Sequence, residues 1–151
     1  MANINLFVGS VYGAALLTAR AVADALRAAG HEVDLLDQPD VADLTRNDHA
    51  VLVCTSTTGS GELPANLVPL YSRLRDEFPL LNGRPFGIIT LGDSSYGDTF
   101  GAAGALMEEL LLELRGRPVQ ERLLFDALET TEPEIEAIPW ALAWAEHLDQ
   151  S

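Results

Sequence analysis

Three polar segments follow apolar runs of the chain, and their residue types suit a ligand with both a phosphate and a flat ring. We define the first loop as residues 9–15, the second loop as 55–66 and the third loop as 91–101. A glycine-containing turn before a helix offers unpaired N–H groups and a positive dipole end, which attract phosphate without Lys or Arg. Glycines and small hydroxylated residues let the backbone approach a polar ring and hydrogen-bond its edge. The first loop therefore predicts an anion site, and the second loop predicts a ring site.

Two side chains have candidate roles of their own in these loops. Ser10 adds a hydroxyl donor to the first loop. Tyr96 stands in the third loop before a glycine and an aspartate, outside any apolar periodic run, so it is a candidate for stacking on a planar ligand. Taken alone, the first loop is more typical of an ordinary strand-to-helix turn and Tyr96 of a surface or half-buried tyrosine, while the second loop has a flexible linker as its alternative. The first loop is not the G-x-G-x-x-G pattern of nicotinamide dinucleotide sites.

Other kinds of chemistry lack the residues that they require. The chain contains no Lys, which excludes a Walker A phosphate site, a Schiff base and a catalytic lysine. Cys54 is the only cysteine and lies in a buried-strand pattern, so we interpret it as a small core residue. His31, His49 and His147 do not have metal-ligand spacing, and we predict no metal site. Trp140 and Trp144 stand four residues apart, which is typical of helix packing against a sheet.

Length and charge limit the class of protein. A chain of 151 residues, 48% hydrophobic and 21% charged, predicts one globular domain over 1–151. The formal net charge of −14 makes nucleic acid and anionic membranes poor partners. No apolar run reaches the roughly 18 residues of a membrane span, and we expect a cytoplasmic, monomeric protein.

Apolar runs and helical periodicity alternate along the chain and predict the elements that position the loops. Gly30 stands where a helix would end, and Pro139 should kink or delay the last helix. The predicted strands are 3–9, 31–36, 50–55, 86–91 and 119–125. The predicted helices are 15–29, 65–77, 99–115 and 132–148.

This alternation predicts an α/β fold with three layers, in which helices cover both faces of a five-stranded parallel sheet. The chain length suits the strand order 2-1-3-4-5. Ligands of such sheets bind beyond the carboxyl ends of the strands, near the point where strand order reverses. The three loops lie at these ends in the predicted fold.

Together the loops resemble those of the flavodoxin family, and within it the short, MioC-like bacterial members. The resemblance spans nearly the whole chain and is carried by residues 10–15, by 56–61 with Pro64 and Asn66, and by 92–96. It implies noncovalent FMN and single-electron transfer between a basic-surfaced reductase and an acceptor redox enzyme, such as a radical enzyme. A carrier of this kind has no catalytic side chains and no substrate turnover of its own.

The resemblance also implies how the cofactor is held. The phosphate would lie on the first loop and the isoalloxazine between the other two. Tyr96 would stack on the outer ring face, the Gly59–Ser60 peptide would lie near flavin N5, and the backbone of Gly92 and Asp93 would meet the pyrimidine edge. Asp126 matches a carboxylate of diflavin relatives, and Glu62, Asp93, Asp98 and Asp126 would ring the flavin mouth and guide a basic partner. The implied cofactor-binding residues are Ser10, Val11, Tyr12, Gly13, Ala14, Ala15, Thr57, Thr58, Gly59, Ser60, Gly61, Leu91, Gly92, Asp93, Tyr96, Phe100 and Asp126.

Some positions depart from the family pattern. Tyr12 and Ala15 replace hydroxyl residues, Thr58 replaces an aromatic residue, and Gly97 is an extra residue in the third loop. These departures keep a cofactor-free interaction module open as an alternative, beside a small FMN-dependent NAD(P)H reductase. A phospho-receiver domain has the same strand order, but the absence of Lys excludes it.

Overall fold

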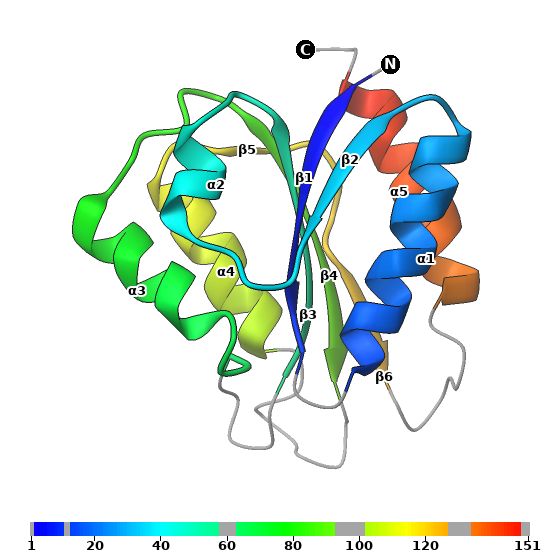
Figure 1. Ribbon diagram of the computed structural model, residues 1–151, viewed down its shortest axis with the longest axis horizontal. Helices are drawn as coiled ribbons and strands as arrows, with labels where there is room; N and C mark the ends of the chain where they lie inside the picture. The colour runs from blue at the N-terminus through cyan, green and yellow to red at the C-terminus, as the bar shows by residue number, and fades with distance from the viewer. Residues whose placement is uncertain (1, 11–12, 58–62, 93–101, 127–133, 149–151) are drawn as a thin grey trace.

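The computed structural model describes residues 2–10, 13–57, 63–92, 102–126 and 134–148, and it describes Ala14 by its backbone only. A parallel sheet of order β2-β1-β3-β4-β5 lies between two helix layers, and β6 also pairs with β4 (Figure 1). The predicted fold class and strand order are therefore confirmed. The strands are β1 Asn3–Gly9, β2 Glu32–Leu36, β3 Ala50–Ser56, β4 Pro85–Gly92, β5 Arg117–Pro118 and β6 Leu123–Asp126. The helices are α1 Ala14–Ala28, α2 Val41–Thr45, α3 Val68–Glu77, α4 Ala102–Glu113 and α5 Glu134–Leu148.

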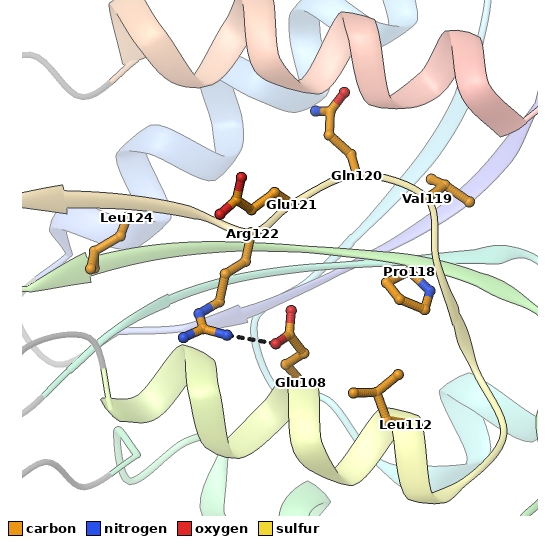
Figure 2. A pocket seen from close by; sticks show the side chains of 8 residues that line it. All are labelled: Glu108, Leu112, Pro118, Val119, Gln120, Glu121, Arg122 and Leu124. Carbon is orange, nitrogen blue, oxygen red and sulfur yellow. Dashed lines mark hydrogen bonds and ion pairs between the residues drawn. The ribbon is translucent and has the colours of Figure 1, made fainter.

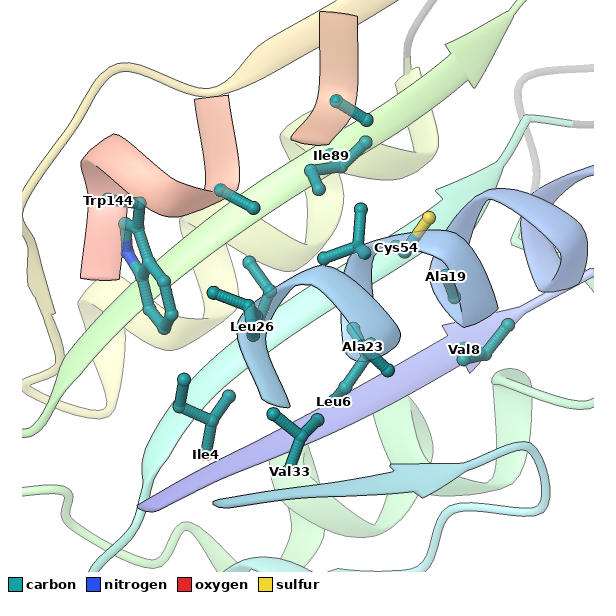
Figure 3. Close-up of a cluster of buried hydrophobic side chains, with 14 of the residues drawn as sticks. Ile4, Leu6, Val8, Ala19, Ala23, Leu26, Val33, Cys54, Ile89 and Trp144 are labelled. Atoms are coloured by element: carbon teal, nitrogen blue, oxygen red, sulfur yellow. The ribbon is translucent and has the colours of Figure 1, made fainter. Parts of the chain in front are cut away.

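Helices α1 and α5 cover one face of the sheet (Figure 1). Figure 3 shows the core that they close, where Leu26 of α1 and Trp144 of α5 lie over Ile4 and Ile89 of the strands. Cys54 is fully buried in the same core, as predicted. Trp144 is also fully buried, so the interpretation of this tryptophan as a core residue is confirmed.

Trp144 fits the sheet because β4 has a glycine beneath it. A Cβ atom on Gly87 would lie 2.5 Å from Trp144 Nε1, closer than real Cβ contacts allow. Trp144 Nε1 donates to the carbonyl of Phe86 at 3.1 Å, beside the point where the β4–β5 pairing stops at Pro118. The indole therefore both fills the core and satisfies a buried carbonyl at the end of a ladder.

Helices α2, α3 and α4 cover the other face (Figure 1). Their core includes Phe7, Leu70, Phe86 and Leu111, each at most 2% exposed. The short helix α2 was not predicted, because five residues are too few to show helical periodicity.

The end of α1 is a Schellman motif, in which two amides beyond the helix bond back to its last carbonyls. Gly30 N donates to Arg27 O at 3.0 Å, and His31 N donates to Leu26 O at 3.1 Å. Gly30 has a φ of 98°, which a glycine adopts without strain. The predicted helix stop at Gly30 is therefore confirmed.

The last predicted strand, 119–125, is wrong over 119–122. Two short strands replace it, because four residues lie between Pro118 and Leu123 while only two lie between their partners Phe86 and Ile89 on β4. Two hydrogen bonds hold the extra residues against α5: Gln120 Nε2 donates to Trp140 O, and Trp140 Nε1 donates to Glu121 O, each at 3.0 Å.

Pro139 does not delay the last helix, which begins at Glu134 and includes Pro139 on its exposed side. Helix α3 begins three residues later than predicted, and the predicted start of α4 at residue 99 lies outside the described residues, which resume at Ala102. Among the described helices, none has both the length and the apolar composition that a membrane span requires.

Candidate functional site

The carboxyl ends of four strands lie at one edge of the sheet, which we call the carboxyl edge. In the strand register Gly9 is opposite Thr55, Ser56 is opposite Leu91, and Gly92 is opposite Asp126. The parallel pairing therefore brings the described ends of all three loops and Asp126 to the same edge.

Ser10 and Gly13 shape the turn from β1 into α1. Gly13 is the N-cap residue, with φ 88° and ψ −8°, and its N–H donates to Ser10 Oγ at 2.8 Å. Ser10 Oγ is the acceptor of this bond, so its own proton can still be donated, and none of the described residues accepts it. The first turn of α1 contains no acidic side chain. Its backbone N–H groups have no acceptor within the helix, so the geometry suits an anion.

Asn66 ties this turn to two other segments. Its Oδ1 accepts from Ser10 N at 3.0 Å. Its Nδ2 donates to Val8 O at 2.8 Å and to Asp37 O at 2.9 Å. One side chain therefore links the end of β1, the residue after β2 and the residues before α3.

A cavity of about 230 Å³ lies beside the turn. Its volume and polar lining suit part of a small ligand rather than a whole cofactor. The cavity is lined by Val8, Ser10, Gly13, Leu16, Asp37, Gln38 and Asn66.

The start of the second loop carries two buried hydroxyl groups that are of interest for ligand binding. Thr57 N donates to Leu91 O at 2.8 Å and so extends the β3–β4 pairing to the edge. Within the described ranges, the buried Ser56 Oγ and Thr57 Oγ1 have no hydrogen-bond partner. Buried hydroxyls normally have a partner, so this part of the edge is suited to a ligand that supplies one.

The third loop begins at Leu91 and Gly92, which are both buried. Gly92 pairs with Asp126 across β4 and β6, so a carboxylate stands at the edge next to the start of the third loop. Asp126 itself is partly buried.

The structure therefore brings several predicted site residues to the carboxyl edge and leaves others untested. Ala15 is fully buried, so its methyl group belongs to the core and is not available to a ligand. Ser10, Gly13, Ala14, Ala15, Thr57, Leu91, Gly92 and Asp126 lie at the edge. Val11, Tyr12, Thr58, Gly59, Ser60, Gly61, Asp93, Tyr96 and Phe100 lie outside the described residues.

A larger cavity, of about 720 Å³, lies outside the predicted site (Figure 2). It runs between α4 and the segment that joins β5 to β6, and Arg122 of that segment forms an ion pair with Glu108 of α4. Its lining contains no predicted site residue. Over the described ranges, no group of three or more His, Cys, Asp or Glu side chains is placed to hold a metal ion.

The role of Asn66 was missed by sequence reasoning, although the residue was noted within the second loop. Its partners Val8, Ser10 and Asp37 are 29 to 58 residues away in the chain, so no local pattern announces them. An amide residue just before a helix in a loop at the carboxyl edge was the one available signal.

A family model, curated sequences and solved structures all match this chain over most of its length. The family model described as Flavodoxin matches residues 6–140. Flavodoxin YqcA of Pectobacterium carotovorum is 43% identical over 99% of this chain and 99% of its own length. Protein MioC of Escherichia coli K12 is 35% identical over 95% of this chain and 97% of its own. The structure of a cysteine-to-serine mutant of flavodoxin from Pseudomonas aeruginosa has a TM-score of 0.91, is 46% identical, and covers 97% of this chain and 99% of its own.

Proposed function

The chain belongs to the flavodoxin family, whose cofactor is FMN, and we propose that it carries single electrons between redox proteins. The observation that carries the proposal is the carboxyl edge, which holds the N-terminus of α1 and two buried hydroxyls that have no partner among the described residues. An electron carrier needs little more than a held and partly exposed flavin, because the cofactor supplies the chemistry.

The described residues fit FMN at two places. At the first loop, Ser10 has a free hydroxyl proton, and the first turn of α1 has free N–H groups and no competing carboxylate. At the second loop, Ser56 Oγ and Thr57 Oγ1 are buried and lack partners among the described residues, as expected beside a polar ring. A phosphate and a ring edge would each find donors at the positions that their chemistry requires.

We propose the following roles for the chain's own groups. The phosphate is held by the hydroxyl of Ser10 and by the backbone N–H groups in the first turn of α1. The segment from Thr57 onward and the segment from Gly92 onward flank the ring, with Tyr96 stacked on its outer face. Bound FMN supplies one-electron chemistry at this edge.

The physiological partners would be recognised by charge. The chain carries a net charge of −14, and Asp126 lies at the proposed flavin edge. We propose that a basic-surfaced reductase and an acceptor redox enzyme dock there in turn, because opposite charge accelerates encounter. A single cysteine fits the reducing cytoplasm, which we propose as the location.

The test is an FMN titration of the purified protein, followed by an anaerobic reductive titration recorded by visible absorption. Stoichiometric FMN uptake and two separate one-electron potentials would support the carrier. Absence of FMN binding would overturn it and favour a cofactor-free interaction module. Steady NAD(P)H oxidation by the isolated holoprotein would overturn it in favour of a reductase.

A further inference from the structure

We propose that Asn66 is a positioning residue that acts on the phosphate of FMN through Ser10, which it holds in place. The inference rests on the proposed FMN site and assigns a role to a residue outside the predicted binding set. The inference concerns how Ser10 is held in the cofactor-free protein, so it can be tested separately from cofactor binding.

The three hydrogen bonds of Asn66 use nearly all of its bonding capacity. An amide side chain has two N–H donors and one oxygen with two lone pairs. Both donors are engaged, on Val8 O and Asp37 O, and the oxygen accepts from Ser10 N. The side chain therefore fixes Val8 and Ser10 on either side of Gly9, where β1 ends.

The neighbouring residue reinforces this position. Leu67 is fully buried, and a Cβ atom on Gly9 would lie 2.9 Å from Leu67 Cδ2. The residues before α3 therefore lie directly against the end of β1. Leu67 packs against Gly9, and Asn66 forms hydrogen bonds with Val8 and Ser10 on either side of Gly9. A glycine at this position permits the close approach.

The orientation of Ser10 follows from these contacts. Its backbone N–H points to Asn66 and is not available to a ligand, while its Oγ accepts from Gly13 N. Both bonds fix the residue, so the remaining hydroxyl proton and the first-turn N–H groups of α1 face a defined place. Binding to a loop that is already ordered avoids the entropic penalty of ordering it.

Asparagine is required for the pattern, because no other residue of the same shape supplies two donors and one acceptor. In Asn66→Asp, a carboxylate would face the carbonyl oxygens of Val8 and Asp37 and lose both donated bonds. In Asn66→Ala, all three bonds are lost without a change of charge. Comparing the two variants separates lost bonds from added negative charge.

The experiment uses the full-length protein, its Asn66→Ala and Asn66→Asp variants, and Asn82→Asp as a control. Asn82 is exposed before the start of β4, away from the carboxyl edge, and its φ of 53° is tolerated by aspartate. The affinities for FMN and for riboflavin, which lacks the phosphate, are measured by flavin fluorescence. Amide hydrogen exchange of Ser10 is followed by NMR in the cofactor-free proteins.

We expect both Asn66 variants to lower FMN affinity by about tenfold or more, the effect of losing hydrogen bonds that hold Ser10, and riboflavin affinity by less than about threefold. We also expect faster exchange of the Ser10 amide, and no change of either kind in Asn82→Asp. Unchanged exchange at Ser10, or equal losses for FMN and riboflavin, would overturn the positioning role. Failure of the unaltered protein to bind FMN would instead remove the proposed function, while the exchange measurement still decides whether Asn66 holds the loop.

Discussion

Substituting Gly87 by alanine tests how the sheet accommodates Trp144. The added Cβ atom would lie 2.5 Å from Trp144 Nε1 and 2.9 Å from both Cδ1 and Cε2. Ordinary contacts at a Cβ atom are 3.4–4 Å, so the indole must move away by nearly 1 Å. Trp144 is fully buried, and the surrounding core leaves it little room to move.

Two effects set the magnitude of the loss. Overpacking of a well-filled core destabilises by about 1–3 kcal/mol. Displacing the indole also stretches the 3.1 Å bond from Nε1 to Phe86 O, and an unpaired buried group costs about 1–3 kcal/mol. We therefore expect Gly87→Ala to lower the free energy of unfolding by about 2–5 kcal/mol.

Urea unfolding of the cofactor-free protein, followed by far-ultraviolet circular dichroism, measures this change. Trp144→Phe serves as the partner variant, because phenylalanine lacks Nε1, the atom nearest to the added methyl group. In the double variant, Gly87→Ala should be less destabilising by at least about 1 kcal/mol than in the parent, as expected for residues in contact. Strictly additive effects, or a loss below about 0.5 kcal/mol for Gly87→Ala alone, would refute the packing argument.

Two further predictions concern the site and the core. Ser10→Ala removes the hydroxyl that accepts from Gly13 N and would donate to the phosphate. FMN affinity should therefore fall about 10- to 100-fold, the range of a charge-assisted hydrogen bond. Ser72→Ala, at an exposed serine, is the control, and equal FMN titration curves for the two variants would contradict the role of Ser10. Burial raises the pKa of the Cys54 thiol from its ordinary value of 9.0 to about 12. As the pH rises, the unfolded chain therefore loses this proton before the folded chain does. Relative to Cys54→Ala, the free energy of unfolding measured in urea should be constant below pH 9 and then decline by about 1.4 kcal/mol per pH unit up to about pH 12. Parallel pH profiles of the two proteins would contradict this pKa shift.

The sequence predicted the central strands well, because β1, β3 and β4 are buried on both faces and are largely apolar. It failed at the fifth strand, where the cause is tertiary. The segment 119–122 is held away from the ladder by the bonds of Gln120 and Glu121 to Trp140, and a local pattern does not reveal a partner 19 or 20 residues later.

The position of the candidate site followed from topology, whereas its support did not. Parallel strands must end at the same edge, so the ends of β1, β3 and β4 were predicted to lie together. The hydrogen bonds of Asn66 depend on how loops distant in the chain meet, and they became visible only in the folded structure. The binding roles of the individual loop residues remain predictions for the FMN titrations to test.

The divided fifth strand also determines how this edge of the sheet could pair with a strand of another chain. An unbroken outer strand presents a row of free N–H and C=O groups on which a strand of another chain can form, which is a route to aggregation. Here Pro118 lacks an N–H group, and residues 119–122 leave the plane of pairing before β6 resumes at Leu123. Along residues 117–126 the sheet therefore offers an incoming strand only short, interrupted stretches, which disfavours strand-to-strand association with another chain.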